Sequence, residues 1–285
     1  MVILEEIIHL IWHALLDALK TLPFLFLAYF LIEYLEHKGN KKLERSLQKL
    51  GPFGPIGGAL MGIIPQCGFS VAASNFYAGR IISVGTLIAV YLSTSDEAIP
   101  ILLSQPEMRR YILPMMAVKF ISAVVFGFII DFVVKKLMNP DEEPPFEELC
   151  YECDCDHLGV LRSALHHTVK IFTFLFIVNL VMECAIHFIG EDSISGLLLH
   201  GSVFQPFLTA LIGLIPNCAS SVILTELFTA GSLEFGSCIA GLCAGAGTGV
   251  VVLFRTNRRP KEDLAILATL YFAAVITGMV INLLF

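Results

Sequence analysis

Long apolar segments alternate with short charged stretches along the 285 residues of the chain. A helix needs about 20 apolar residues to span a bilayer. Segments that approach this length are residues 21–34, 81–103, 111–134, 171–189, 236–254 and 264–285. The pattern therefore predicts an all-α integral membrane protein that crosses the bilayer several times.

Two further apolar segments, residues 52–79 and 203–230, carry Gly and Pro near their middle. Each predicts either one broken crossing or a re-entrant pair of half-helices, because Pro interrupts the helical hydrogen bonds. The sequence leaves both alternatives open.

Two shorter segments carry a polar stripe. Residues 3–19 repeat acidic or His side chains every four positions on an otherwise apolar helix. Residues 158–168, with Arg162, His166 and His167, are the counterpart in the second half of the chain. We expect both segments to lie along the membrane surface or to pack on the rim of the bundle.

Composition agrees with a membrane protein: 56% of the residues are hydrophobic, 15% are charged, and the mean hydropathy is +0.79. The net charge of −7 comes without a basic patch, which excludes nucleic acid as a partner. A cleavable signal peptide is not expected, because Glu5 and Glu6 stand where a signal peptide carries basic residues.

The chain repeats itself when residues 59–71 are laid over residues 210–222. The positions that coincide are Gly62, Pro65, Cys67, Ser70 and Val71 with Gly213, Pro216, Cys218, Ser221 and Val222. The repeat predicts a first transmembrane unit at 1–137, an acidic Cys-rich linker at 138–157 and a second transmembrane unit at 158–285.

The distribution of Lys and Arg favours opposite orientations of the two repeats. Placing residues 38–49, 135–170 and 255–263 in the cytoplasm gathers most of the basic residues there and leaves the acidic loop 190–201 outside. A parallel arrangement with the linker outside gathers fewer of them. Inverted repeats with broken helices are typical of transporters that bind cargo near the bilayer midplane.

The repeated Pro-x-Cys motif supplies candidate ligands at each predicted break. Pro removes a backbone donor, so nearby carbonyls need other partners. Thiol, amide and hydroxyl groups there could hold a partly dehydrated transition metal or an arsenical. The candidates are Gln66, Cys67 and Ser70, with Asn217, Cys218 and Ser221. The alternative is that these small polar residues only allow close helix packing.

Further candidate binding residues lie within apolar segments: Asn75, Thr94, Ser95, Asp96, Glu97 and Glu226. Acids inside a membrane are costly, so we expect Asp96, Glu97 and Glu226 to face a polar cavity or a partner such as Lys119. Such acids would also suit proton coupling. Alternatively, Asp96 and Glu97 lie close to a membrane surface.

Two i, i+4 pairs, Glu33 with His37 and Glu183 with His187, could each supply two ligands to a divalent metal ion. A solvated ion pair or a water-lined vestibule is the alternative reading.

The linker carries Cys150, Cys153, Cys155 and His157 among acidic residues. This set could form a soft-metal site that captures cargo or senses metal. The alternative is a solvated acidic spacer.

Several of these features together resemble a known family. They are the Gly-x-x-Pro-x-Cys-x-x-Ser motif in both halves, the stretch Ser-Thr-Ser-Asp-Glu-Ala-Ile-Pro at 93–100, and the Cys- and His-bearing central loop. The chain resembles bacterial ten-span heavy-metal exporters, described as arsenic efflux proteins or manganese transporters, and more distantly the organoarsenical permeases.

The resemblance implies a multi-pass transporter in the inner membrane of a bacterium or archaeon, with manganese, another divalent metal or an arsenical as cargo. Since no Gly-x-x-x-x-Gly-Lys-[Ser/Thr] motif is present, we expect a secondary transporter that does not itself hydrolyse ATP, and the acids within apolar segments favour coupling to protons. An enzyme is not expected, because no His-Glu-x-x-His motif appears. No cofactor beyond the cargo is expected, and the bilayer and a homodimer are the partners considered. A membrane-embedded metal-dependent enzyme and a passive ion channel are the alternatives.

Overall fold

The computed structural model describes residues 51–137 without 65, 67 and 95–97, residues 160–189, residues 202 and 204–284 without 258, and scattered residues between 12 and 30. Every regular element within these described parts is helical, which confirms the all-α prediction. The described residues between 12 and 30 are helical as well.

The first half runs through η1 (Gly51–Phe53), α3 (Gly54–Gly62), α4 (Gly68–Ala78), α5 (Val84–Ser93), α6 (Ala98–Ser104), η2 (Arg109–Tyr111) and α7 (Ile112–Leu137). Helix α8 (Val160–Ile189) follows. The second half contains α10 (Gln205–Gly213), α11 (Cys218–Thr229), α12 (Phe235–Ala244), α13 (Thr248–Thr256) and α14 (Pro260–Leu284). Among the described residues, the segments 54–137 and 205–284 therefore each contain two pairs of short α-helices and then one long α-helix.

The predicted breaks at the Pro-x-Cys motifs are present. Helix α3 ends at Gly62 and α4 begins at Gly68, while α10 ends at Gly213 and α11 begins at Cys218. Pro216 lies in the second break, where its missing N–H group cannot continue the helical hydrogen bonds.

Two predicted spans are present but are not continuous helices, and one predicted surface helix was wrong. Residues 81–103 and 236–254 coincide with the candidate membrane spans Val84–Ser104 and Phe235–Thr256, but the first is interrupted after Ser93 and the second after Ala244. In the second break, Gly247 adopts a φ of 56°, a left-handed conformation that only Gly adopts readily. Residues 158–168 are not a separate surface helix, because α8 runs without a break from Val160 to Ile189. Neither Gly nor Pro interrupts it.

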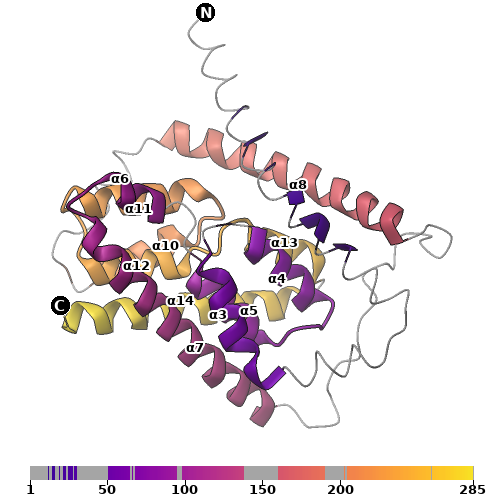
Figure 1. Cartoon of the computed structure of the whole chain (residues 1–285), viewed down its shortest axis with the longest axis horizontal. Helices are drawn as coiled ribbons and strands as arrows, with labels where there is room; N and C mark the ends of the chain where they lie inside the picture. Colours follow the sequence, from indigo (N-terminus) through magenta and orange to yellow (C-terminus); the bar gives the residue numbers. More distant parts are fainter. Residues whose placement is uncertain are drawn as a thin grey trace, which may run out of the picture.

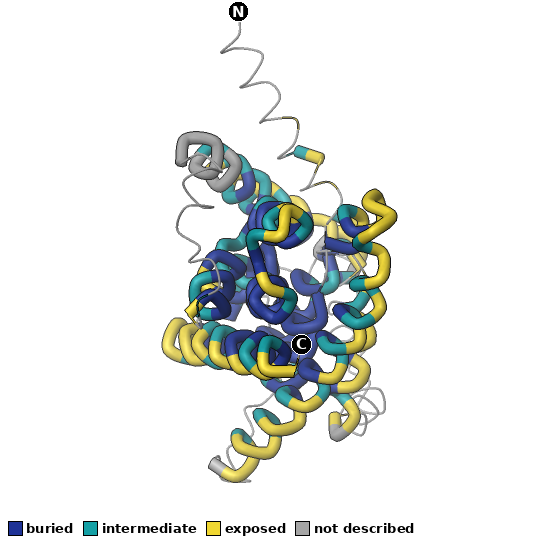
Figure 2. The backbone as a smooth tube through the Cα atoms, turned by 90° about the vertical axis from the view of Figure 1, so that its left-hand side faces the viewer, coloured by how far each residue is buried: buried dark blue, intermediate teal, exposed yellow. Residues whose placement is uncertain are grey.

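Within the described residues, five helical stretches are long and apolar enough to cross a membrane. They are Val84–Ser104, Arg109–Lys136, Ala164–Val181, Phe235–Thr256 and Pro260–Leu284. Large apolar side chains point outward from α7 and α14, with Leu113 77%, Phe132 69% and Leu283 85% exposed. Figure 2 shows exposed residues on the outer helices and buried residues at the centre. An apolar outer surface of this kind fits lipid, and the chain is an integral membrane protein.

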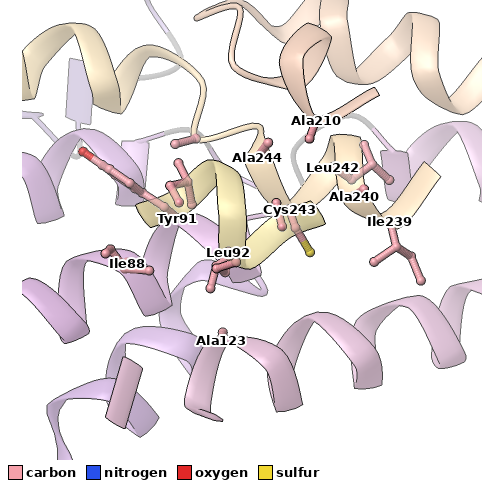
Figure 3. Packing of buried hydrophobic residues seen from close by; sticks show 14 of the residues in the cluster. Ile88, Tyr91, Leu92, Ala123, Ala210, Ile239, Ala240, Leu242, Cys243 and Ala244 are labelled. Atoms are coloured by element: carbon pink, nitrogen blue, oxygen red, sulfur yellow. The ribbon is translucent and has the colours of Figure 1, made fainter. Parts of the chain in front are cut away.

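Helices α5 and α12 form the centre of the molecule, where nearly all their residues are buried. Figure 3 shows Tyr91 and Leu92 of α5 in the same cluster as Ala240 and Cys243 of α12. Each central helix packs closely on the long helix of its own half. A Cβ added to Gly85 would lie 2.1 Å from the Gly127 carbonyl oxygen, and one added to Gly236 would lie 2.4 Å from that of Gly278. These glycines therefore permit the same close approach in both halves.

The short helix that directly follows each Pro-x-Cys break packs on the opposite half of the chain. Figure 1 shows α4 beside α13, and α11 beside α6, at two separate places in the molecule. Each half thus completes its packing with a helix of the other half.

Candidate functional site

A buried junction of hydroxyl groups joins α4, α5 and α13. The Ser74 hydroxyl lies 2.7 Å from the Ser70 carbonyl oxygen, 2.7 Å from the Gly249 carbonyl oxygen and 2.7 Å from the Tyr91 hydroxyl. A Cβ at Gly249 would lie 2.8 Å from the Ser70 backbone, so only Gly lets α13 approach α4 so closely. Ser70, Ser74 and Tyr91 are fully buried. The junction therefore places polar groups at the interface of the two halves.

Asn75 lies one residue further along α4 and links it to the N-terminal segment. Its side-chain amide donates to the Val71 carbonyl oxygen at 3.1 Å and accepts a hydrogen bond from the Tyr29 hydroxyl at 3.0 Å. The Tyr29 ring stacks on His167 of α8, with centroids 5.5 Å apart. Asn75 thus ties α4 to the peripheral helices.

The second Pro-x-Cys break positions Asn217 as the N-cap of α11. Its side-chain oxygen accepts a hydrogen bond from the Ala219 N–H at 3.3 Å. Its side-chain nitrogen is buried and has no hydrogen-bond partner among the described residues. At the start of α13, the buried Thr248 hydroxyl also has no hydrogen-bond partner among the described residues. Buried polar groups are normally paired, so each needs a water or a ligand.

Cys218 and Ser221 follow Asn217 on the first turn of α11 and are partly exposed. The Ser221 hydroxyl donates to the Cys218 carbonyl oxygen at 2.7 Å. The first-half positions that align with them are Cys67, which lies outside the described residues, and Ser70, which is fully buried. The two breaks therefore differ in how far their hydroxyl groups are accessible.

Lys119 of α7 is the fully buried cation at the centre of the described structure. Its ammonium donates to the carbonyl oxygen of Thr94, just after α5, and to that of Leu242 in α12 at 2.7 Å. Thr94, a predicted binding residue, is buried, and its hydroxyl donates to the Val90 carbonyl oxygen at 2.7 Å.

The remaining predicted residues are distributed as follows. Gln66 is partly exposed in the first break. Glu226 is exposed on α11, so the structure does not bring it together with the buried polar groups. Glu183 and His187 belong to α8, but their side chains lie outside the described part. Also outside it are Cys67, Ser95, Asp96, Glu97, Glu33, His37, Cys150, Cys153, Cys155 and His157.

Within the described residues, no three His, Cys, Asp or Glu side chains gather at a position where they could hold a metal ion. Ser74 and Tyr91 were not predicted from the sequence as site residues, and Lys119 was predicted only as a partner for acids. The available signals were the i, i+4 spacing of Ser70 and Ser74 and the single Lys in the apolar run 111–134.

A charged cluster closes one end of the α4–α13 interface. Arg80, just after α4, forms an ion pair with Glu262 of α14 at 2.7 Å, and Tyr77 also hydrogen-bonds to Glu262. A second Arg80 nitrogen lies 3.3 Å from the Asn257 side-chain oxygen. Burial alone would lower the pKa of Arg80, but the hydrogen bonds and charge of Glu262 outweigh it, and the pKa is raised. We call Tyr77, Arg80 and Glu262 the ionic end.

An aromatic cluster lies beside the α11–α6 interface, at the position equivalent to that of the charged cluster beside α4 and α13. The Tyr111 ring lies edge-on to Phe228, with centroids 5.2 Å apart, and 5.4 Å from Phe235. Phe228 and Phe235 are 5.8 Å apart. We call these three residues the aromatic end.

Helix breaks with buried polar groups, enclosed by apolar helices, are typical of multi-pass membrane transporters. A family model described as "Putative, 10TM heavy-metal exporter" matches residues 7–191 and also residues 160–285. The chain belongs to this family, whose partners are the lipid bilayer and a metal cargo. No curated protein and no solved structure matched the chain.

Proposed function

We propose that this protein is a secondary transporter that exports a heavy-metal ion or metalloid in exchange for protons, by alternating access. The observation that carries the proposal is the crossed packing of broken helices, α4 on α13 and α11 on α6. Because each half contributes to the packing of the other, a relative movement of the halves would change both interfaces at once.

The proposed cargo site lies at the Pro-x-Cys breaks and uses Gln66, Cys67, Ser70, Asn217, Cys218 and Ser221. The buried Asn217 nitrogen, which has no partner among the described residues, supports a ligand or an ordered water at the second break. Its donor character suits an oxygen carried by the cargo, such as a metal-bound water or an arsenite hydroxyl. The thiols would favour thiophilic cargo, while hydroxyl and amide oxygens suit manganese.

Proton coupling is assigned to Asp96 and Glu97, with Glu226 as a more accessible acid. The linker residues Cys150, Cys153, Cys155 and His157 are proposed to capture metal before transport. The pairs Glu33–His37 and Glu183–His187 are proposed to bind metal at the ends of their helices. A homodimer, and a bacterial or archaeal inner membrane as the location, also belong to this proposal.

Flux into proteoliposomes tests the function, with manganese, zinc, cadmium, iron(II) and arsenite offered separately. We expect saturable flux of at least one cargo that depends on the imposed pH gradient. Flux that does not saturate would indicate a channel, and chemical turnover without flux would indicate an enzyme.

Ser221→Ala tests the site within the same assay. Ser104→Ala is the matched control, because the exposed Ser104 hydroxyl makes the same local bond, to the Ile101 carbonyl oxygen at 2.7 Å. We expect a several-fold loss of flux for Ser221→Ala and none for Ser104→Ala. Cys67→Ser and Cys218→Ser should reduce cadmium or arsenite flux more than manganese flux. Wild-type flux in all three site variants would mean that the motif serves helix packing alone.

A further inference from the structure

The Lys119 ammonium lies where helix ends from the two halves of the chain meet. It donates to the Thr94 carbonyl oxygen, directly beyond the end of α5, and to the Leu242 carbonyl oxygen in the last turn of α12. Lys119 itself comes from α7 and is fully buried. One ammonium group from α7 therefore contacts the ends of both α5 and α12.

Both carbonyl oxygens lie at helix ends, since α5 ends at Ser93 and α12 ends at Ala244. The last carbonyl groups of a helix have no donor within it. At the end of α12, the Gly245 N–H bonds to Gly241 and the Ala246 N–H bonds to Ala244, so neither bonds to Leu242. The C-terminal end of a helix also carries partial negative charge. Two such ends that meet in a buried place attract a cation.

We propose that the ends of α5 and α12 form a binding site for a monovalent alkali cation, and that the Lys119 ammonium occupies it as a built-in substitute. Backbone carbonyl oxygens that accept hydrogen bonds from an ammonium group can also coordinate alkali cations, as they do in potassium-channel filters. Ammonium matches potassium in charge and closely in size. The position aligned with Lys119 in the second half is Leu270, which is also fully buried, so a single ammonium serves both helix ends.

This proposal goes beyond the proposed function, because it concerns how the two helix ends are held together and not the ion that is exchanged for cargo. A transporter with a tethered cation at this place needs no sodium or potassium to hold the two helix ends together. Without Lys119, the same ends would repel each other until a free cation bound between them.

The test compares apparent melting temperatures of purified, detergent-solubilised protein in potassium, sodium or N-methyl-D-glucamine chloride at equal ionic strength. We expect the melting temperature of wild type to be the same in all three salts. Lys119→Ala should melt several degrees lower in N-methyl-D-glucamine and recover in potassium or sodium, since a ligand that binds only the folded state stabilises it. Lys136→Ala, which removes an exposed Lys from the same helix, should show no salt-specific change.

Equal melting of Lys119→Ala in all three salts would overturn the proposal. If the variant cannot be purified without alkali cations, purification in potassium decides: recovery there supports the site, and loss in every salt contradicts it. Lys119→Gln, which keeps a neutral donor, should respond to potassium less than Lys119→Ala. Because melting does not require transport, wild-type protein without flux would refute the proposed function and leave this site standing.

Discussion

The ionic end and the aromatic end of the molecule have the same backbone conformation but differ in side-chain chemistry. In the alignment that places Cys67 on Cys218, Tyr77 corresponds to Phe228, Arg80 to Gly231 and Tyr111 to Glu262. The ion pair of Arg80 with Glu262 thus occupies the place of the Tyr111–Phe228 contact.

The backbone at the ends of α4 and α11 follows the same path. Arg80 N–H bonds to Tyr77 at 2.9 Å, and Gly231 N–H bonds to Phe228 at 3.0 Å. Arg80 and Gly231 both adopt left-handed conformations, with φ of 58° and 76°. The repeated sequence therefore determines the backbone turn, while the side chains that pack beside it differ. At the ionic end they form a charged pair that water can hydrate, and at the aromatic end they are rings that water does not stabilise.

The largest expected difference between the two ends is the side of the membrane on which each lies. If the repeats are inverted, the ionic end faces the cytoplasm and the aromatic end faces outside. Reporter fusions after Lys49, within 141–156 and after Arg259 should then indicate the cytoplasm, and a fusion after Asp192 the outside. An outside signal from the linker would favour parallel repeats, with both ends on one side.

Truncation of the aromatic end should cost the most stability. Phe228 is 7% exposed, and Phe228→Ala should lower the free energy of unfolding by about 3 kcal/mol, because it removes ring contacts and leaves a cavity. The measurement is the melting temperature in detergent. Phe132→Ala is the control, since Phe132 is 69% exposed, and its substitution should have little effect in detergent. Equal losses in both variants would show that the aromatic cluster adds no specific stability.

Neutralising the ionic end should lower the free energy of unfolding by somewhat less than truncating the aromatic end. Glu262→Gln keeps the shape of the side chain but leaves the Arg80 guanidinium without its charged partner, and we expect a loss of about 2 kcal/mol. The side chain of Arg80 is 8% exposed and that of Glu262 is 28%, so water relieves part of the penalty. Glu107→Gln, at an exposed position, is the matched control. Added salt should narrow the difference between Glu262→Gln and wild type, but not that between Phe228→Ala and wild type.

The sequence was sufficient to predict the apolar helices and the breaks at Pro-x-Cys, because Pro and Gly act on the backbone locally. The breaks after Ser93 and Ala244 were not predicted, since each lies within an apolar run long enough for one span.

The residues that join the halves could not be identified from sequence for a different reason. Ser74 bonds to Gly249, which is 175 positions away, and Lys119 bonds to Leu242, which is 123 positions away. Both acceptors are backbone carbonyl oxygens, which every residue has. A sequence can indicate that a buried Lys needs a partner, but the identity of a carbonyl partner depends on where a helix ends and on which helix packs there.

The smallest expected effect concerns the left-handed residue that the two ends share. Gly231→Ala should lower the free energy of unfolding by about 1 kcal/mol, since no atom lies within 4 Å of the added Cβ and the backbone conformation at φ 76° is the whole penalty. Gly57→Ala is the control: it also adds a Cβ into open space, but within helix α3, where Ala is favoured.

Arg80 incurs the same backbone penalty at φ 58°, and its ion pair offsets it. Arg80→Gly should therefore destabilise the wild-type protein but stabilise Glu262→Gln, and melting temperatures of the four variants measure this change of sign. A loss of stability on Arg80→Gly in both backgrounds would show that Arg80 is held by contacts other than Glu262.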